Sequence, residues 1–251
     1  MPVSFLIPTS PYRSRRRWYA RPQFYLPVTL IVLLLIIFGA VYFGIVSSQL
    51  KREAATYDLS KLEQNDQLPR DLVNAVVAME DNKFYQHQGY DPSGIVRAAF
   101  KNFVAGHVRQ GASTITQQLA RNSFALKEKT YRRKLLEIYV AERIEQQYDK
   151  QKIMELYLNR IYFGGGLYGA EAAARGYFDK PAREMSLVEC ATLAGIIKSP
   201  NRLSPWTDRP AARESRNVAL ARMRDLGFIP RRMVAPFFDF ESASRAVIGP
   251  S

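Results

Sequence analysis

An apolar run from Phe24 to Val46 contains no charged side chain. At about 1.5 Å of rise per residue, a helix of this length crosses a bilayer core about 30 Å thick. The alternatives are a buried core helix and a cleavable signal peptide. The apolar region of a signal peptide is only about 7 to 15 residues long and precedes a small-residue cleavage site, which Ser47-Ser48-Gln49 matches poorly. The run predicts an uncleaved transmembrane anchor.

A cluster of arginines precedes this anchor, with no acidic residue nearby: Arg13, Arg15, Arg16, Arg17 and Arg21. Basic residues beside a span stay in the cytoplasm. This predicts a single-pass protein of the cytoplasmic (inner) membrane, with everything after Val46 on the periplasmic or extracellular side. A net charge of +13 would otherwise favour nucleic-acid binding. Topology explains the basic cluster, so we expect no nucleic-acid partner.

The chain divides into five expected parts. They are a cytoplasmic basic segment (1–23), the anchor (24–46), a stalk (47–68), a catalytic domain (69–230) and an irregular tail (231–251). Apolar residues of the catalytic region recur at helical spacing, and alternating Val, Ile or Thr runs do not dominate, which predicts a mostly α fold. The single cysteine, Cys190, lies in such an apolar pattern and is interpreted as core packing.

Helices are expected over seven stretches of this domain. They are 71–81, 93–104, 115–124, 131–147, 150–160, 169–177 and 186–198, with a terminal helix over 210–227. The stripe formed by Ile95, Val96, Ala99, Phe100, Phe103 and Val104 has two interpretations. It packs on the core, or it lies at a membrane interface.

Two carboxylates, Glu80 and Glu137, bracket a polar and basic stretch. A carboxylate can take a proton from a sugar hydroxyl, and cations suit a phosphate-bearing leaving group. The pattern favours glycosyl transfer from a phosphorylated donor. The candidate substrate-binding residues are Asp81, Phe84, Ser113, Thr114, Gln117, Gln118, Arg121, Lys129, Arg133 and Lys134.

At these residues the chain resembles the peptidoglycan glycosyltransferases, the transglycosylase module of class A penicillin-binding proteins and their monofunctional relatives. Five blocks occur in the order of the family: EDNKFYQHQG from Glu80, GASTITQQ from Gly111, RKLLE from Arg133, KIMELYLN from Lys152 and GAEAAARGYF from Gly169. The resemblance covers roughly residues 60 to 230. Arg121 stands where many members carry Lys, and Lys129 where some carry Arg.

The resemblance implies a lysozyme-like domain with a small membrane-contacting lobe. It implies polymerisation of lipid II into β-1,4 glycan, with inversion and release of undecaprenyl pyrophosphate. Glu80 would be the general base, and Glu137 would orient the donor pyrophosphate through a divalent cation (Mg or Mn) or through a nearby basic residue. His87 would be structural. The implied partners are lipid II, the growing lipid-linked glycan, the membrane and other cell-wall synthesis proteins.

Other interpretations of these residues stay open. Glu137 could form an ordinary i,i+3 pair with Lys134, and the basic run could be a solvated face. A glycan hydrolase uses comparable carboxylates, and a scaffold that lost catalysis is the non-enzymatic alternative. Too few residues follow Gly227 for a transpeptidase region, so the chain as given is expected to be monofunctional.

Overall fold

A computed structural model describes residues 22–59, 68–105, 113–124, 126 and 130–230. The arginine cluster of residues 13–21, the candidate Lys129 and the expected tail 231–251 lie outside these residues. The chain falls into two compact units, residues 1–49 and 50–251. The candidate site belongs to the second.

The first helix, α1, runs from Pro22 to Ala55. Its stretch Thr29–Ala55 is long and apolar enough to cross a membrane. The helix continues past Val46, so the first part of the expected stalk is helical. Leu50 and Ala54 are buried within the second unit.

The end of α1 is attached to α5 (Tyr131–Gln147). Arg143 of α5 donates hydrogen bonds to the backbone oxygens of Ala54 and Tyr57. Tyr148, directly after α5, donates to the backbone oxygen of Leu59 at 2.9 Å. Residues 50–59 are therefore structurally part of the second unit.

The second unit is built of helices, which confirms the predicted mostly α fold. Its other elements are α2 (Arg70–Glu80), η3 (Phe84–Gln86), α3 (Pro92–Ala105), α4 (Ile115–Ser123), α6 (Lys150–Leu158), α7 (Ala170–Phe178), η4 (Ala182–Glu184), α8 (Leu187–Ile196), α9 (Pro200–Leu203) and α10 (Arg209–Asp225). Among the described residues the only β pairing is an isolated antiparallel bridge between Tyr162 and Tyr168.

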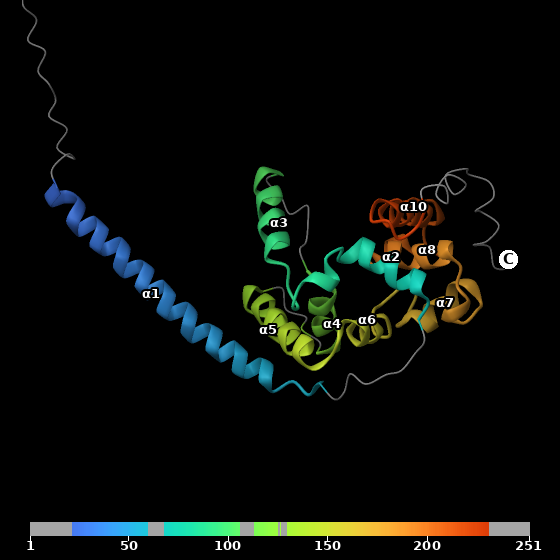
Figure 1. The fold of residues 1–251 in the computed structure, drawn as a ribbon, viewed down its shortest axis with the longest axis horizontal. Helices are drawn as coiled ribbons and strands as arrows, with labels where there is room; N and C mark the ends of the chain where they lie inside the picture. The colour runs from blue at the N-terminus through green and yellow to red at the C-terminus, as the bar shows by residue number, and fades with distance from the viewer. Residues whose placement is uncertain (1–21, 60–67, 106–112, 125, 127–129, 231–251) are drawn as a thin grey trace, which may run out of the picture. The chain divides into compact units, whose positions relative to one another are not determined.

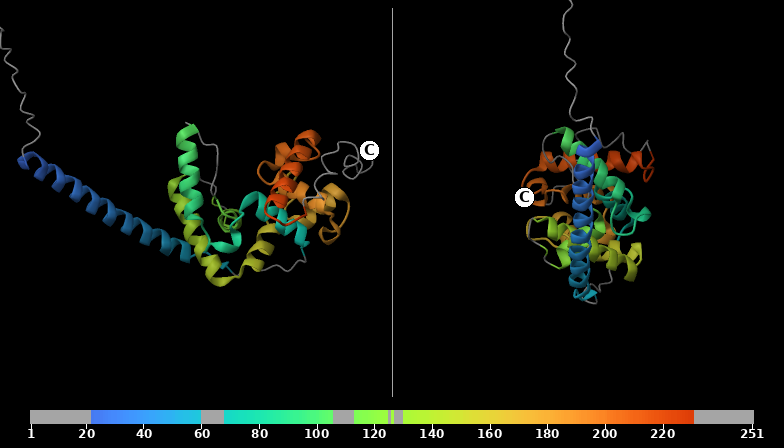
Figure 2. Two further views of the ribbon diagram at one scale, coloured as in Figure 1. Left: turned by 45° about the horizontal axis from the view of Figure 1, so that its top comes forward. Right: turned by 90° about the vertical axis from the view of Figure 1, so that its left-hand side faces the viewer.

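Two groups of packed helices form the central part of this unit (Figure 1). In one group α2 packs against α8 and α10, and in the other α4 packs against α5 and α6. Figure 2 shows the orange and red helices of the first group beside the green and yellow helices of the second. Fully buried side chains, including Leu72, Ile115 and Leu156, form the core. The candidate site lies where the end of α2 meets α4.

Side-chain caps fix where the helices of the site begin. Thr114 accepts a hydrogen bond from the backbone N–H of Gln117 at the start of α4. Thr130 does the same for Arg133 at the start of α5. Such caps satisfy amide groups that have no partner inside the helix. Helices α4 and α5 therefore start just before the residues that form the site.

The apolar stripe of α3 faces solvent in this structure. Ile95 is 38% exposed, and Val96, Phe100, Phe103 and Val104 are 68–85% exposed. The interpretation of these side chains as core packing is therefore wrong. A contiguous exposed apolar face is typical of a surface that contacts a membrane or another protein.

Candidate active site

Glu80 is the last residue of α2 and lies half-buried against α4. The Nε2 atom of Gln118 donates to Glu80 Oε2 at 2.7 Å, and Tyr157 Oη donates to Gln118 Oε1 at 3.1 Å. Burial raises the pKa of Glu80, while Gln118 and the charges of Arg222, Lys198 and Arg121 oppose that rise. A carboxylate with a raised pKa holds a proton more readily, which suits a general base.

Asp81 connects the end of α2 to two neighbouring segments. Its Oδ2 atom lies 2.9 Å from His87 Nε2 and accepts a hydrogen bond from the Ile115 backbone N–H at 3.1 Å. Both side chains of the Asp81–His87 pair are almost fully buried. This geometry gives His87 a holding role, which agrees with the structural role that the resemblance implies for it.

Gly89 lets the chain approach α5 closely. Its φ is +91°, and a Cβ atom there would lie 3.1 Å from the backbone carbon of Ala141. An L-residue at this position would be strained and crowded. The backbone oxygen of Gly89 accepts a hydrogen bond from Thr114 Oγ1 at 2.6 Å. The first motif is thus fixed to the start of α4.

Phe84 is fully buried in η3. The ammonium group of Lys150 lies 4.6 Å from the centre of its ring and donates to the His87 backbone oxygen at 2.6 Å. Lys150 is in turn paired with Glu145. This expected substrate-binding residue is placed in the core of the motif and makes no surface for a ligand in this structure.

A second polar cluster joins α4 to α5 and is centred on Lys134. Its Nζ atom donates to Ser113 Oγ and Gln117 Oε1, each at 2.8 Å, and to Glu137 Oε2 at 3.0 Å. Arg133 binds the other oxygen of Glu137. Burial lowers the pKa of Lys134, and Glu137 opposes this effect. These contacts bring together five of the candidates, Ser113, Gln117, Arg133, Lys134 and Glu137.

The i,i+3 pair between Lys134 and Glu137 is present, but it is not an exposed surface pair. Glu137 is 1% exposed. Both of its oxygens are taken by cations. The described residues around this carboxylate therefore do not fit a divalent cation, and they match the basic-residue alternative for orienting an anion. No group of three or more potential metal-ligand side chains occurs in the described part of the chain.

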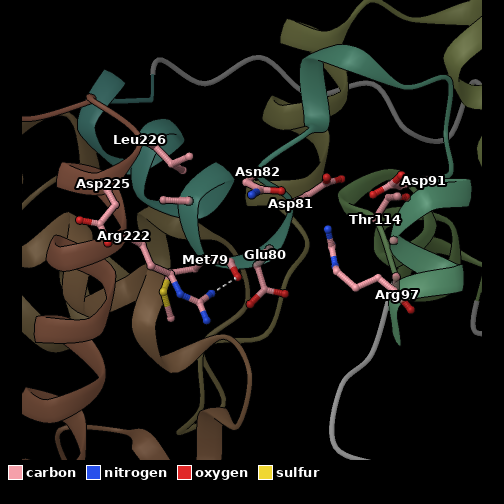
Figure 3. A pocket seen from close by; sticks show the side chains of 13 residues that line it. Met79, Glu80, Asp81, Asn82, Asp91, Arg97, Thr114, Arg222, Asp225 and Leu226 are labelled. Carbon is pink, nitrogen blue, oxygen red and sulfur yellow. Dashed lines mark hydrogen bonds between the residues drawn. The ribbon is translucent and has the colours of Figure 1, made fainter. Parts of the chain in front are cut away.

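An open pocket of about 500 Å³ lies beside Glu80. The candidates Glu80, Asp81, Ser113 and Thr114 line it, together with Arg97 of α3 and Arg222 of α10. Figure 3 shows Arg222 and Arg97 on opposite sides of Glu80. Arg222 also donates to the backbone oxygen of Met79 at 2.9 Å.

Sequence reasoning did not identify Arg97, Lys198, Arg222 or Tyr157. Each is separated from Glu80 in the sequence: Arg97 lies on α3, Tyr157 on α6 and Arg222 on α10, and Lys198 follows α8. The terminal helix carries several arginines at similar spacing, so nothing marks Arg222 among them. Only the packing of α10 on α2 singles it out.

Several known proteins are similar to this chain. The transglycosylase family model matches residues 46–224. Penicillin-binding protein 1A of Aquifex aeolicus is 50% identical over 164 residues, which cover 65% of this chain and 23% of that protein. The corresponding protein of Escherichia coli is 48% identical over 167 residues, which cover 66% of this chain and 20% of that protein.

A Cupriavidus necator protein provisionally named a transglycosylase is 47% identical over 164 residues, covering 65% of this chain and 71% of that protein. A crystal structure of penicillin-binding protein 1A from Haemophilus influenzae matches with 32% identity and a TM-score of 0.35, over 49% of this chain and 16% of that one. The chain spans about a fifth to a quarter of the penicillin-binding proteins it matches. On the family match over most of its length, the chain belongs to the transglycosylase family.

Proposed function

We propose that the protein is a peptidoglycan glycosyltransferase that polymerises lipid II into β-1,4 glycan and releases undecaprenyl pyrophosphate. The observation that carries this proposal is that α4 contacts two separate polar groups, one at the end of α2 and one on α5. A half-buried carboxylate with a raised pKa, Glu80, opens onto the pocket, and a cationic cluster around Lys134 lies on the α5 side. Glycosyl transfer from a pyrophosphate donor needs one group of each kind.

Glu80 acts as the general base. It takes the proton from the C4 hydroxyl of the acceptor sugar as the oxygen attacks C1 of the donor. Inversion at C1 requires this base on the face opposite the leaving group, as in inverting glycosidases, with the acceptor hydroxyl in place of water. Its raised pKa favours this step, because general bases work best when their pKa is near the operating pH.

Lys134, Arg133 and Arg121 stabilise the departing pyrophosphate. Negative charge grows on the leaving oxygens as the glycosidic bond breaks, and fixed cations lower the energy of that state. Glu137 holds Arg133 and Lys134 in place through its two buried ion pairs. In this role Glu137 orients the donor through basic residues. Ser113, Thr114, Gln117 and Gln118 supply neutral polar groups for sugar hydroxyls and phosphate oxygens.

Membrane attachment fits a lipid-linked substrate. The apolar helix α1 would anchor the protein in the cytoplasmic membrane as a single-pass protein, and the arginines before it support a catalytic domain on the periplasmic or extracellular side. The exposed apolar face of α3 contacts the same membrane, where the lipid tail of the substrate lies. The proposed domain order is the one expected from the sequence, with residues 50–59 of the expected stalk joined to the catalytic domain. Other cell-wall synthesis proteins are proposed partners.

Incubation of the detergent-solubilised protein with lipid-linked disaccharide-peptide tests this function. We expect polymeric glycan from this substrate. In a second incubation, with finished peptidoglycan, we expect no soluble muropeptides, because the internal linkages of that polymer carry no pyrophosphate. Soluble muropeptides without any polymer would instead establish the hydrolase alternative.

A further inference from the structure

A buried tyrosine is hydrogen-bonded to the glutamine that contacts the proposed general base. Tyr157 lies on α6, is fully buried, and its hydroxyl contacts Gln118. Gln118 in turn contacts Glu80. The hydroxyl has no place in the mechanism described above, since the side chain of Gln118 separates it from Glu80.

The polarity of this chain of hydrogen bonds follows from its two ends. An ionised carboxylate only accepts hydrogen bonds, so Glu80 requires the N–H end of the Gln118 amide. The oxygen end then faces Tyr157 and requires a donor. A phenol supplies one, whereas a phenylalanine at the same position would leave a buried oxygen without a partner.

The surrounding charges keep the phenol in its donating form. Burial and the negative charges of Glu80 and Asp81 raise the pKa of Tyr157 well above its ordinary value, and Arg121 opposes this effect. A neutral hydroxyl near two carboxylates points its hydrogen toward them, and that is the direction of Gln118. Cooperative polarisation then strengthens the N–H bond that Gln118 makes to Glu80.

We propose that Tyr157 is a positioning residue that fixes which end of the Gln118 amide faces Glu80 and thereby keeps Glu80 ionised and ready to accept a proton. No proton passes along the chain, because the amide only orients. This inference rests on the proposed function, in which Glu80 is the general base. Without the hydroxyl, the amide is free to turn its oxygen toward Glu80, which is favourable only when Glu80 is protonated.

The other groups around Glu80 do not mask the effect of Tyr157 on the protonation of Glu80. Gln118 and Arg121 face it from α4, Arg222 from α10, and Lys198 from the segment after α8. The other charged residues that line the pocket are Asp81, Asp91, Arg97 and Asp225. Within the described part of the chain, the Tyr157 hydroxyl hydrogen-bonds to Gln118 alone, so a change at Tyr157 acts through the amide.

The test is the pH profile of polymerisation by the full-length enzyme carrying Tyr157→Phe. We expect the acid limb of kcat/KM to move up by about 0.5 to 1 pH unit, the size of one net hydrogen bond. A ring-fluorinated tyrosine at position 157 is a stronger donor and should move the limb down. Tyr177→Phe is the matched control, since the hydroxyl of this buried tyrosine contacts the Phe163 backbone oxygen and Ser204, and neither of them hydrogen-bonds to Glu80. An unmoved limb in both variants at position 157 would overturn the proposal.

A second measurement needs no turnover and separates this proposal from the proposed function. A thermal-unfolding double-mutant cycle combines Tyr157→Phe with Glu80→Gln at neutral pH. We expect a non-additive change, because the hydroxyl matters more when residue 80 is charged. Additive changes would contradict the coupling. A wild-type protein that makes no polymer would overturn the proposed function, while the cycle still decides the role of Tyr157.

Discussion

The guanidinium of Arg222 binds the backbone oxygen of Met79 at 2.9 Å, across 143 residues of sequence. This contact ties the end of α10 to the last turn of α2, directly before Glu80. The same arginine holds the pKa of Glu80 down, against the effect of burial. One exposed side chain therefore acts on both the position and the charge of the proposed base.

Arg222→Met should move the acid limb of polymerisation to higher pH. The loss of kcat/KM at neutral pH should be small, about two- to fivefold, because exposed charge pairs are worth only about 0.2–1 kcal/mol. Arg224→Met is the matched control, since Arg224 pairs only with its neighbour Asp225 in the described residues. Equal pH profiles for the two variants would show that the charge of Arg222 does not act on Glu80.

Glu80→Gln should stabilise the fold near neutral pH. The folded pKa of Glu80 is raised above its ordinary value of 4.5, so the folded state binds this proton more tightly than the unfolded state. The wild type therefore loses stability as pH rises from below 4.5 through the folded pKa. A difference of one between the folded and unfolded pKa corresponds to about 1.4 kcal/mol in the free energy of unfolding.

Thermal unfolding checks this prediction. The melting temperature of Glu80→Gln should exceed that of the wild type at neutral pH and equal it below pH 4.5. A variant that is less stable at neutral pH would show that ionised Glu80 helps to hold the fold together.

Lys134→Met should lower kcat for the lipid-linked donor by about 10²- to 10³-fold, the range for loss of one fixed donor to a developing charge. Lys152→Met is a suitable control, because Lys152 forms the same i,i+3 pair with a glutamate, Glu155, on another helix. Rates are measured at saturating donor. Wild-type turnover in Lys134→Met would mean that the cationic cluster is a solvated face.

Helix positions can be predicted closely from the sequence, because local signals determine them. The helix predicted over residues 131–147 is found with those bounds, and it begins at a Thr130 cap. Apolar spacing also places Glu80 at the end of the first motif helix, and the structure has it there. Cys190 is buried as expected, and burial raises the pKa of its thiol to about 12.

Features that depend on distant contacts could not be predicted. Residues 50–55 continue α1 and consist of strong helix formers, but their attachment to α5 through Arg143 could not be predicted, because it depends on a contact between distant residues. The apolar spacing of α3 is the same whether it faces a core or a membrane. Arg222 and Tyr157 come near Glu80 only through packing between helices, which no sequence pattern indicates.

The proposed orientation predicts a protease pattern. Protease added to intact spheroplasts should digest the region after Val46 and spare a tag placed before Arg13, because basic residues beside a span stay in the cytoplasm. The same digestion after lysis should remove both. Protection of the catalytic domain in intact spheroplasts would reverse the topology and exclude a substrate on the outer face.

The rate of glycan polymerisation by Glu80→Gln, measured beside its binding of lipid-linked disaccharide-peptide, tests the central claim most directly. The amide keeps the shape of the carboxylate and the contact with Gln118, but it cannot accept the proton. We predict a fall in rate of about 10²- to 10⁴-fold with substrate binding retained. A variant that keeps more than about a third of the wild-type rate, a loss far below that range, would contradict the assignment of Glu80 as the general base.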